Sequence, residues 1–368
     1  MLKRTDIFII GGGPAGLATA IAARNRGFDV TVADGAQPPI DKACGEGLMP
    51  DGRVALQELG ISIPEEESHP FRGIRFVSSG LSTDASFPNG NGVGVRRTEL
   101  HRIMATHAER AGVRLLWQTP VTGLRSDGVL LGSHLVDARW IVGADGGHSL
   151  VRQWAGLDRY ACDRMRFAFR RHYRIAPWSE FMELHWGPKC QIYLTPVAHD
   201  EVCVALISHD QNLRLDDALP KFPAILERLR QAEPSTAERG AISSTRRLRR
   251  VYEGNVVLVG DASGSVDAIT GEGLHLSFAQ ASLLADCFAS GDLQRYQKIH
   301  RKLAVRPALM AKLMLTLDWK TFFRQRVMRA LESDPGLFSR MLAMHVGGRP
   351  TTDLAGIGVS LGWRMLRA

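Results

Sequence analysis

The chain has 368 residues, of which 45% are hydrophobic and 23% charged, with 37 Gly and 17 Pro; this composition excludes a disordered or fibrous protein. The length predicts two or three compact units, with a core large enough to need no disulfide or metal. The five cysteines are scattered and never spaced as a CxxC pair, so we expect neither a disulfide framework nor a structural zinc site. No apolar run reaches the roughly 18 residues that span a bilayer, and no cleavable signal opens the chain, which favours a cytoplasmic protein.

The formal net charge of +8 is concentrated at one end of the chain. Residues 301–368 hold twelve basic and four acidic residues, and the preceding 300 are neutral overall. A basic charge over the whole chain would favour a nucleic-acid partner, which we therefore do not expect. A basic terminal segment indicates either a peripheral contact with an anionic membrane surface or a solvated helical face. The composition predicts no oligomeric state.

A glycine-rich turn follows the first predicted strand, residues 6–10, and precedes a helical run over residues 17–26. The turn consists of Gly11, Gly12, Gly13, Pro14, Ala15 and Gly16. Gly11 permits a tight turn, Gly13 lets the backbone approach a pyrophosphate, and Gly16 lets the helix pack closely on the strand. The free backbone N–H groups at the start of the helix, from Ala15 onward, would hold the phosphates. A second predicted strand, residues 29–33, ends at Asp34, which can accept hydrogen bonds from a ribose 2′-hydroxyl. Together these features predict a dinucleotide site.

Two later segments each place an aspartate after a buried strand. The first contains Gly143-Ala144-Asp145, and the second, residues 255–263, contains Gly260-Asp261. Gly271-Glu272-Gly273 and a helical run from Leu274 follow the second segment. Taken with the glycine-rich turn, these motifs resemble the FAD-dependent hydroxylases related to para-hydroxybenzoate hydroxylase and the geranylgeranyl reductase branch of that superfamily. The resemblance covers roughly residues 5–300.

The resemblance implies an α/β fold: a Rossmann-like FAD-binding domain with an inserted antiparallel-sheet substrate domain and C-terminal helices. Because the motifs are interleaved with three short alternating segments, at 181–186, 191–197 and 201–208, the FAD-binding domain must be discontinuous. We assign residues 1–72, 95–155 and 251–300 to the FAD-binding domain, 73–94 and 156–250 to the substrate domain, and 301–368 to a C-terminal helical segment. Helical patterns at 304–317, 319–331 and 336–345 are expected to cap the substrate cavity, and their basic character could also bring it to anionic lipid.

The resemblance also implies roles for single residues. Asp261 would accept a hydrogen bond from a ribitol hydroxyl, and backbone N–H groups at Gly271–Leu274 would approach the flavin ring. Arg97 would reach the FAD phosphates, or else form a surface ion pair. Asp145 would support the pyrophosphate region through its neighbours or shape a turn, and the backbone at Val121 would meet adenine. The residues assigned to the cofactor are Gly11, Gly13, Pro14, Ala15, Gly16, Asp34, Cys44, Gly45, Arg97, Val121, Asp145, Gly260, Asp261, Gly271, Gly273 and Leu274.

Candidate catalytic residues are fewer. Cys44, in the loop Lys42-Ala43-Cys44-Gly45-Glu46, could place a thiol beside the flavin ring, where it would tune the ring or donate a proton; it could equally pack as a small apolar residue. His172 and His185 are acid/base candidates on predicted strands. Alternation places His185 on the face of its strand opposite Met182 and Leu184, and either face could cover the flavin. We predict no metal site.

No second GxGxxG follows a strand, so a nicotinamide would have to visit transiently, or a separate reductase would supply the electrons. The resemblance therefore implies an FAD-dependent oxidoreductase reduced by NAD(P)H or by another protein. The leading hypothesis is a monooxygenase that hydroxylates an aromatic or polyketide-like small molecule through a flavin hydroperoxide. The alternative is a geranylgeranyl reductase-like enzyme that reduces alkenes of a prenyl or lipid substrate. A non-catalytic flavin-binding protein is the alternative from another class.

Overall fold

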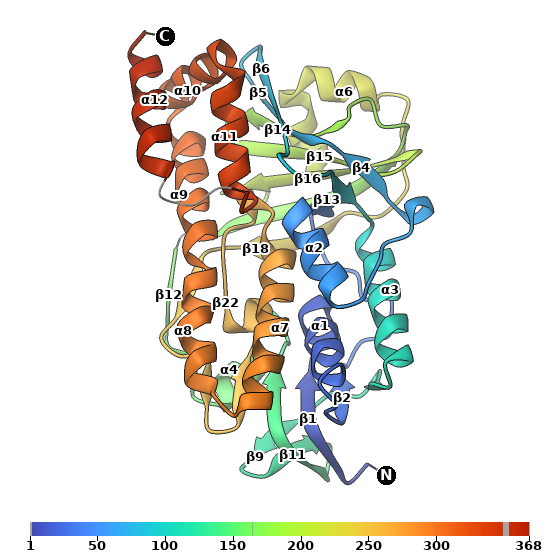
Figure 1. Ribbon diagram of the computed structural model, residues 1–368. Coiled ribbons are helices and arrows are strands. Elements are labelled where there is room, and N and C mark those ends of the chain that lie inside the picture. Colours follow the sequence, from blue (N-terminus) through green and yellow to red (C-terminus); the bar gives the residue numbers. More distant parts are fainter. Residues whose placement is uncertain (1, 164, 349–352, 368) are drawn as a thin grey trace.

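The computed structural model describes residues 2–163, 165–348 and 353–367, and it contains two large sheets with helices around them (Figure 1). The predicted α/β fold class is confirmed.

The first sheet carries the nucleotide motifs. Its parallel strands are, in order across the sheet, β21 (Val256–Leu258), β11 (His134–Gly143), β1 (Arg4–Ile10), β2 (Val30–Ala33) and β8 (Arg114–Leu116). Antiparallel strands at its edges are β20 (Tyr252–Glu253), β10 (Gly128–Leu131) and β9 (Gly123–Arg125).

Alternation along β1 explains how this sheet is covered. Ile7 and Ile9 are fully buried in the core that the sheet shares with α1 (Pro14–Arg24), α3 (Arg97–Arg110) and α7 (Gly273–Ser290). Phe8 and Ile10 point to the other face and pack with the β9–β10 hairpin and α4 (Leu150–Trp154). Because both faces are covered, β1 carries a continuous apolar run from Ile7 to Ile10, as a strand buried in a parallel sheet requires.

The second sheet lies between segments of the first in sequence. Its strands are, in order, β17 (Glu233–Pro234), β13 (Arg166–Arg174), β16 (Glu201–Ser208), β15 (Cys190–Ala198), β14 (Phe181–Gly187), β5 (Gly73–Ser78) and β6 (Leu81–Ser86), with β18 (Arg239–Ser243) also paired to β13. The predicted antiparallel run from residue 181 to 208 is present as β14, β15 and β16. One face of this sheet packs on α5 (Leu215–Ala218) and α6 (Pro223–Leu229), and the other faces a cavity.

Two small sheets and one helix connect the large sheets. They are β3 (Gly47–Leu48), β7 (Gly92–Gly94) and β4 (His69–Phe71) in one, β12 (Tyr160–Cys162), β19 (Arg246–Leu248) and β22 (Gly264–Ser265) in the other, and α2 (Pro50–Glu58). Arg246 and Arg247 lie in β19, which pairs with both β12 and β22.

The C-terminal helices stack along one side of the molecule (Figure 1). They are α8 (Leu293–Leu303), α9 (Val305–Trp319), α10 (Thr321–Ser333), α11 (Pro335–His345) and α12 (Leu354–Arg367). The three predicted helical segments correspond to α9, α10 and α11, and α12 is an additional helix; residues 349–352 and 368 of the predicted terminal segment lie outside the described residues. Phe338 of α11 packs on Phe76 of β5, with ring centroids 4.4 Å apart, which joins these helices to the second sheet.

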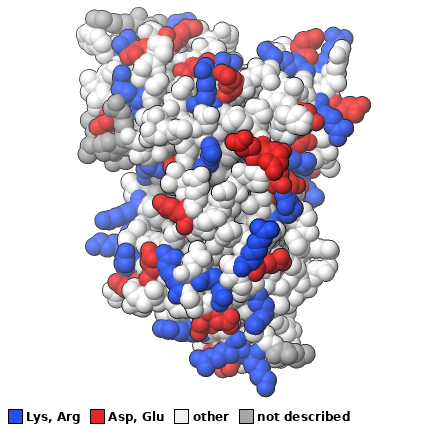
Figure 2. Space-filling model, turned by 45° about the vertical axis from the view of Figure 1, so that its right-hand side comes forward, with Lys and Arg blue, Asp and Glu red and all other residues white. Residues whose placement is uncertain are grey.

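Basic and acidic side chains are interspersed over the face that Figure 2 shows. Among the described residues, no helix combines the length and the apolar character that crossing a bilayer requires.

Candidate cofactor and substrate site

A cavity of about 1000 Å³ lies where the two sheets and the C-terminal helices meet. The glycine-rich turn and the loop at residues 42–49 form one end of it. The second sheet, α9 and α11 form the other end. Segments far apart in the sequence therefore share one enclosed space.

The glycine-rich turn has the geometry of a phosphate-binding loop. A Cβ at Gly11, where φ is +111°, would lie 2.4 Å from the Ala144 carbonyl oxygen, and a Cβ at Gly16 would lie 1.9 Å from the Gly11 carbonyl oxygen. Close packing thus requires glycine at both positions. Around Gly13, by contrast, no heavy atom lies within 4 Å of such a Cβ, and Gly13, Pro14 and Ala15 line the cavity. The turn leaves room for a ligand at the N-terminus of α1, where the helix dipole favours an anion.

Asp34 holds this turn in place. One carboxylate oxygen accepts a hydrogen bond from the Gly12 N–H at 2.7 Å, and the other accepts one from the Ala36 N–H at 2.8 Å. The carboxylate retains further acceptor capacity for a ribose. Val121 is half-buried, and Pro120 beside it lies against Gly35, so the segment predicted to meet adenine adjoins the Asp34 turn. Neither Asp34 nor Val121 is among the described residues that line the cavity.

Asp261 lines the cavity, and three cations lie near its carboxylate. Enclosure by the protein raises the pKa of the Asp261 carboxyl, while the charges of Lys42, Arg97 and Arg246 oppose that rise. The Nε atoms of Arg97 and Arg246 are buried and have no hydrogen-bond partner among the described residues. Gly260, which precedes Asp261, has φ +60°, and a Cβ there would lie 2.6 Å from Ala15 Cβ. Unpartnered Nε donors beside the phosphate-binding loop fit an anionic ligand.

Asp145 acts through its neighbours. Its carboxylate accepts hydrogen bonds from the N–H groups of Leu150, at 2.8 Å, and Val151, at 3.1 Å, and so caps α4. Gly146 and Gly147, which follow Asp145, line the cavity, and the carbonyl oxygen of Gly147 accepts a hydrogen bond from Arg246.

Two loops meet at the flavin end of the predicted site. Gly271, Gly273 and Leu274 line the cavity at the start of α7, and a Cβ at Gly271 would lie 3.3 Å from Met49 Cε. Opposite them, Cys44 and Gly45 line the cavity as well. No heavy atom lies within 4 Å of a Cβ at Gly45 or Gly273, so the space between these loops is open.

Cys44 is a protonated thiol in these surroundings. Burial raises its pKa, and Arg97 opposes the rise. Its Sγ accepts a hydrogen bond from the Glu46 N–H at 3.4 Å. A thiol that keeps its proton is a proton donor rather than a nucleophile.

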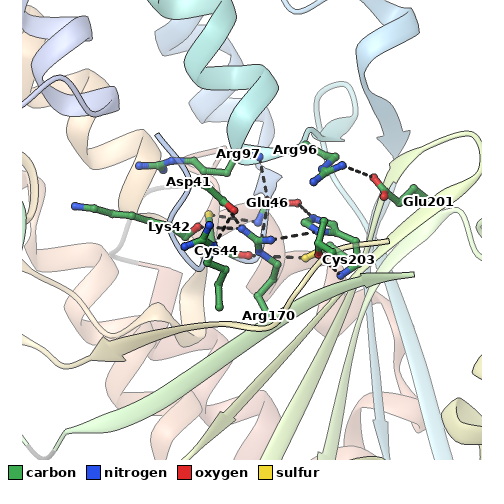
Figure 3. Close-up of polar contacts among 12 residues, drawn as sticks. Asp41, Lys42, Cys44, Glu46, Arg96, Arg97, Arg170, Glu201 and Cys203 are labelled. Atoms are coloured by element: carbon green, nitrogen blue, oxygen red, sulfur yellow. Dashed lines mark hydrogen bonds and ion pairs between the residues drawn. The ribbon is translucent and has the colours of Figure 1, made fainter. Parts of the chain in front are cut away.

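A buried ionic network holds the Cys44 loop against the second sheet (Figure 3). Glu46 adopts φ +59° between two glycines, a conformation that non-glycine residues rarely hold without support. Its Oε1 accepts a hydrogen bond from the Arg97 N–H at 3.0 Å and lies 3.7 Å from Arg170 Nε. Its Oε2 lies 2.5 Å from His172 Nε2. Arg170 also pairs with Asp41, so the loop is tied to β13 at two points.

A metal is not needed to balance this network. The ligand atoms of Glu46, His172 and Cys203 lie within 4.8 Å of one another, which is compatible with a metal. However, the guanidinium of Arg170 already supplies the positive charge beside the Glu46 carboxylate.

The structure places both predicted acid/base histidines away from the cavity surface. His172 is fully buried beneath the Cys44 loop, where its Nδ1 lies 2.9 Å from Thr236 Oγ1. On β14, Met182 and Leu184 line the cavity, so the alternate face that carries His185 points elsewhere; His185 Nε2 lies 2.7 Å from Glu183 Oε2. Neither histidine lines the cavity. The prediction that they act as acid/base groups on a substrate there is therefore wrong.

Two residues that the sequence analysis did not single out line the cavity instead. His345, on α11, has its Nε2 3.0 Å from the Thr270 carbonyl oxygen, next to the Gly271 loop. Arg170, on β13, is 1% exposed and lines the cavity. Its position within an alternating strand was a usable signal, whereas the pattern of α11 contained none for His345.

One part of the remaining cavity wall is apolar. It includes Ile74, Phe76, Met182, Leu184, Met310, Met314, Phe338, Met341 and Leu342, whereas Gln211, Asn212 and Arg214 add polar groups elsewhere in the lining. The hydroxyl of Tyr193, which also lines the cavity, is occupied because it donates to the Ile269 carbonyl oxygen at 3.1 Å.

These features define a dinucleotide-binding flavoprotein with a substrate chamber. FAD fits the residues present, since the phosphate loop, the two unpaired guanidinium donors and the open space between the two glycine loops lie in one cavity. Residues 4–291 match the family model described as an FAD binding domain, and the chain belongs to this family.

Known proteins agree with the predicted resemblance. The chain is 27% identical over 324 residues to menaquinone reductase of Mycolicibacterium smegmatis, covering 80% of this chain and 79% of the relative. It is 26% identical over 299 residues to digeranylgeranylglycerophospholipid reductase 2 of Methanosphaera stadtmanae, covering 74% of each. A flavoprotein/dehydrogenase from Cytophaga hutchinsonii has a similar structure, with a TM-score of 0.81, 20% identity and coverage of 94% and 93% of the two chains. The protein is thus of the FAD-dependent oxidoreductase type.

Proposed function

We propose that the protein is an FAD-dependent reductase that saturates a carbon–carbon double bond in a prenyl chain of a lipid. The observation that carries the proposal is the part of the chamber between the second sheet, α9 and α11, where the wall is formed mainly by aliphatic, thioether and phenyl groups. Such a wall suits a hydrocarbon chain. The names of the menaquinone and digeranylgeranylglycerophospholipid reductases, which match most of the chain, add support.

The residues of the chain would divide the work as follows. FAD, when bound and reduced, would supply the hydride that one alkene carbon receives. Cys44 supplies the proton to the other carbon, because burial keeps its thiol protonated and it lines the cavity. Backbone N–H groups at Gly271–Leu274 orient the ring, and Lys42, Arg97 and Arg246 bind the phosphates. The two electrons come from NAD(P)H or from a separate reductase.

Single turnover under strict anaerobiosis tests the proposal. The photoreduced protein is mixed with a detergent-solubilised geranylgeranyl lipid, and the product is analysed by mass spectrometry. We expect reoxidation of the flavin and a product two mass units heavier than the substrate, without oxygen. Cys44→Ser should retain the yellow cofactor and slow this turnover at least ten-fold. An anaerobic mixture that stays bleached and yields no product would overturn the proposal.

Hydroxylation is the second candidate, and His345 favours it. His345 lines the cavity beside the Gly271 loop, and its Nε2 donates to the Thr270 carbonyl oxygen, so its Nδ1, which has no hydrogen-bond partner among the described residues, is the nitrogen left to accept the proton of a phenolic substrate. The same experiment separates the two reactions, because a monooxygenase forms its product only with oxygen and adds sixteen mass units. A protein that binds flavin without turnover would give no product in either atmosphere and no substrate-stimulated oxidation of NAD(P)H.

A further inference from the structure

A second, shallower pocket of about 470 Å³ adjoins the chamber and has a different character. Its walls carry three cations, two hydroxyl groups and one carboxylate, together with apolar groups of α9. The lining residues are Asp163, Thr245, Arg247, Ala308, Lys312, Leu315, Thr316, Trp319 and Lys320. Arg247 pairs with Asp163 at 3.2 Å. Lys312 and Lys320 have no ion-pair partner among the described residues, so the pocket has an excess of positive charge.

This basic pocket and the chamber share their walls. Along α9, Met310 and Met314 line the chamber, whereas Lys312 and Leu315 line the basic pocket. In the segment that enters β19, Arg246 lines the chamber, and the residues on either side of it line the basic pocket. One layer of side chains therefore separates a cationic surface site from the apolar interior.

Exposed aromatic residues stand beside the basic pocket at the turn between α9 and α10. The side chains of Trp319 and Phe322 are 61% and 70% exposed, and the guanidinium of Arg326 lies 4.8 Å from the Phe322 ring centroid. The turn is firmly anchored, because the buried carboxylate of Asp318 lies 3.8 Å from Arg166 and 3.6 Å from His209. Aromatic rings at an anchored turn, flanked by cations, are typical of a surface that sits among lipid headgroups.

We infer that the α9–α10 turn docks on an anionic membrane: Trp319 and Phe322 enter the headgroup layer, and the basic pocket binds lipid phosphate. The inference rests on the proposed function, since it places the chamber next to the bilayer in which a prenyl lipid dissolves. The partner is a lipid surface rather than a protein, because phosphate matches the excess positive charge and the two rings are the groups that partition at a bilayer interface.

Sedimentation of the full-length holoprotein with vesicles tests this inference without turnover. We expect binding to vesicles of equal parts phosphatidylglycerol and phosphatidylcholine, and little binding to phosphatidylcholine alone. Lys312→Gln combined with Lys320→Gln should weaken binding about 30-fold. Trp319→Ser combined with Phe322→Ser should also release the protein. Lys3→Gln combined with Lys298→Gln is the charge-matched control and should bind like the unaltered protein.

Three results would overturn the inference: no binding to the anionic vesicles, equal binding to both kinds of vesicle, or equal losses in the control. The protein could also self-associate without binding vesicles. If the Trp319→Ser and Phe322→Ser pair abolishes that self-association, the turn docks on a second copy of the chain and the membrane inference is wrong. Turnover of a detergent-solubilised lipid is measured separately. If the lipid is reduced but vesicles are not bound, only the docking inference falls; if vesicles are bound but the lipid is not reduced, the proposed reaction falls instead.

Discussion

Replacement of Glu46 by glutamine should destabilise the protein by an amount that the buried network sets. The substitution keeps the shape of the side chain and removes the charge that faces Arg170 and His172. Breaking a buried ion pair by removing one partner costs about 3–5 kcal/mol. Since Arg170 retains Asp41 as a partner, we expect the lower end, about 3 kcal/mol.

Urea denaturation of the holoprotein, followed by circular dichroism and by flavin absorbance, measures this loss. Glu227→Gln is the matched control: its side chain is 75% exposed and 3.8 Å from Arg230, so its effect should stay within about 0.5 kcal/mol. In an Arg170→Gln background, Glu46→Gln should cost clearly less than it does alone, because the two residues interact. Equal costs in both backgrounds, or a Glu46→Gln protein as stable as the original, would refute the argument.

Three further predictions concern the cofactor and the response to pH. Asp261→Ala should purify with little flavin absorbance, because it removes the carboxylate expected to accept a hydrogen bond from the ribitol of FAD; a fully yellow variant would contradict the assignment of Asp261 to FAD. Gly13→Ala should fold normally by circular dichroism but bind FAD weakly, since the added methyl group enters the open phosphate space rather than the protein; undiminished FAD affinity would contradict this. Burial lowers the pKa of His300 to about 4, so between pH 6.5 and pH 4 the unfolded chain binds a proton that the folded chain does not. Stability should therefore fall by up to about 3 kcal/mol as the pH falls through this window, and His300→Gln should flatten the midpoint-against-pH curve.

The sequence predicted those parts of the site that depend on local geometry. The glycine-rich turn is recognisable because Gly11 and Gly16 are required by contacts within one βαβ unit. The strand at residues 201–208 has the predicted bounds because a short apolar run between polar turn residues is typical of a strand, and here both of its faces are buried. Asp34 was expected at the end of β2, and it lies there.

Parts that depend on distant contacts were beyond prediction. His172 pairs with the carboxylate of Glu46, which lies 126 positions earlier in the chain, and it does not line the cavity. No periodicity in the sequence predicts a pairing over such a distance. His345 reaches the cavity because α11 packs on the second sheet, so its role follows from the docking of a helix rather than from its own pattern. Local pattern fixes which face of an element is apolar, whereas tertiary packing decides what that face meets.

The chamber wall is rich in methionine. Met310 and Met314 from α9, Met341 from α11 and Met182 from β14 all line it. Unbranched thioethers change rotamer at small cost and fill irregular gaps. A chamber built this way conforms to guests of different length and curvature. Selectivity between substrates then depends on the opposite end of the site, where the arginines and the glycine loops lie at the predicted cofactor position.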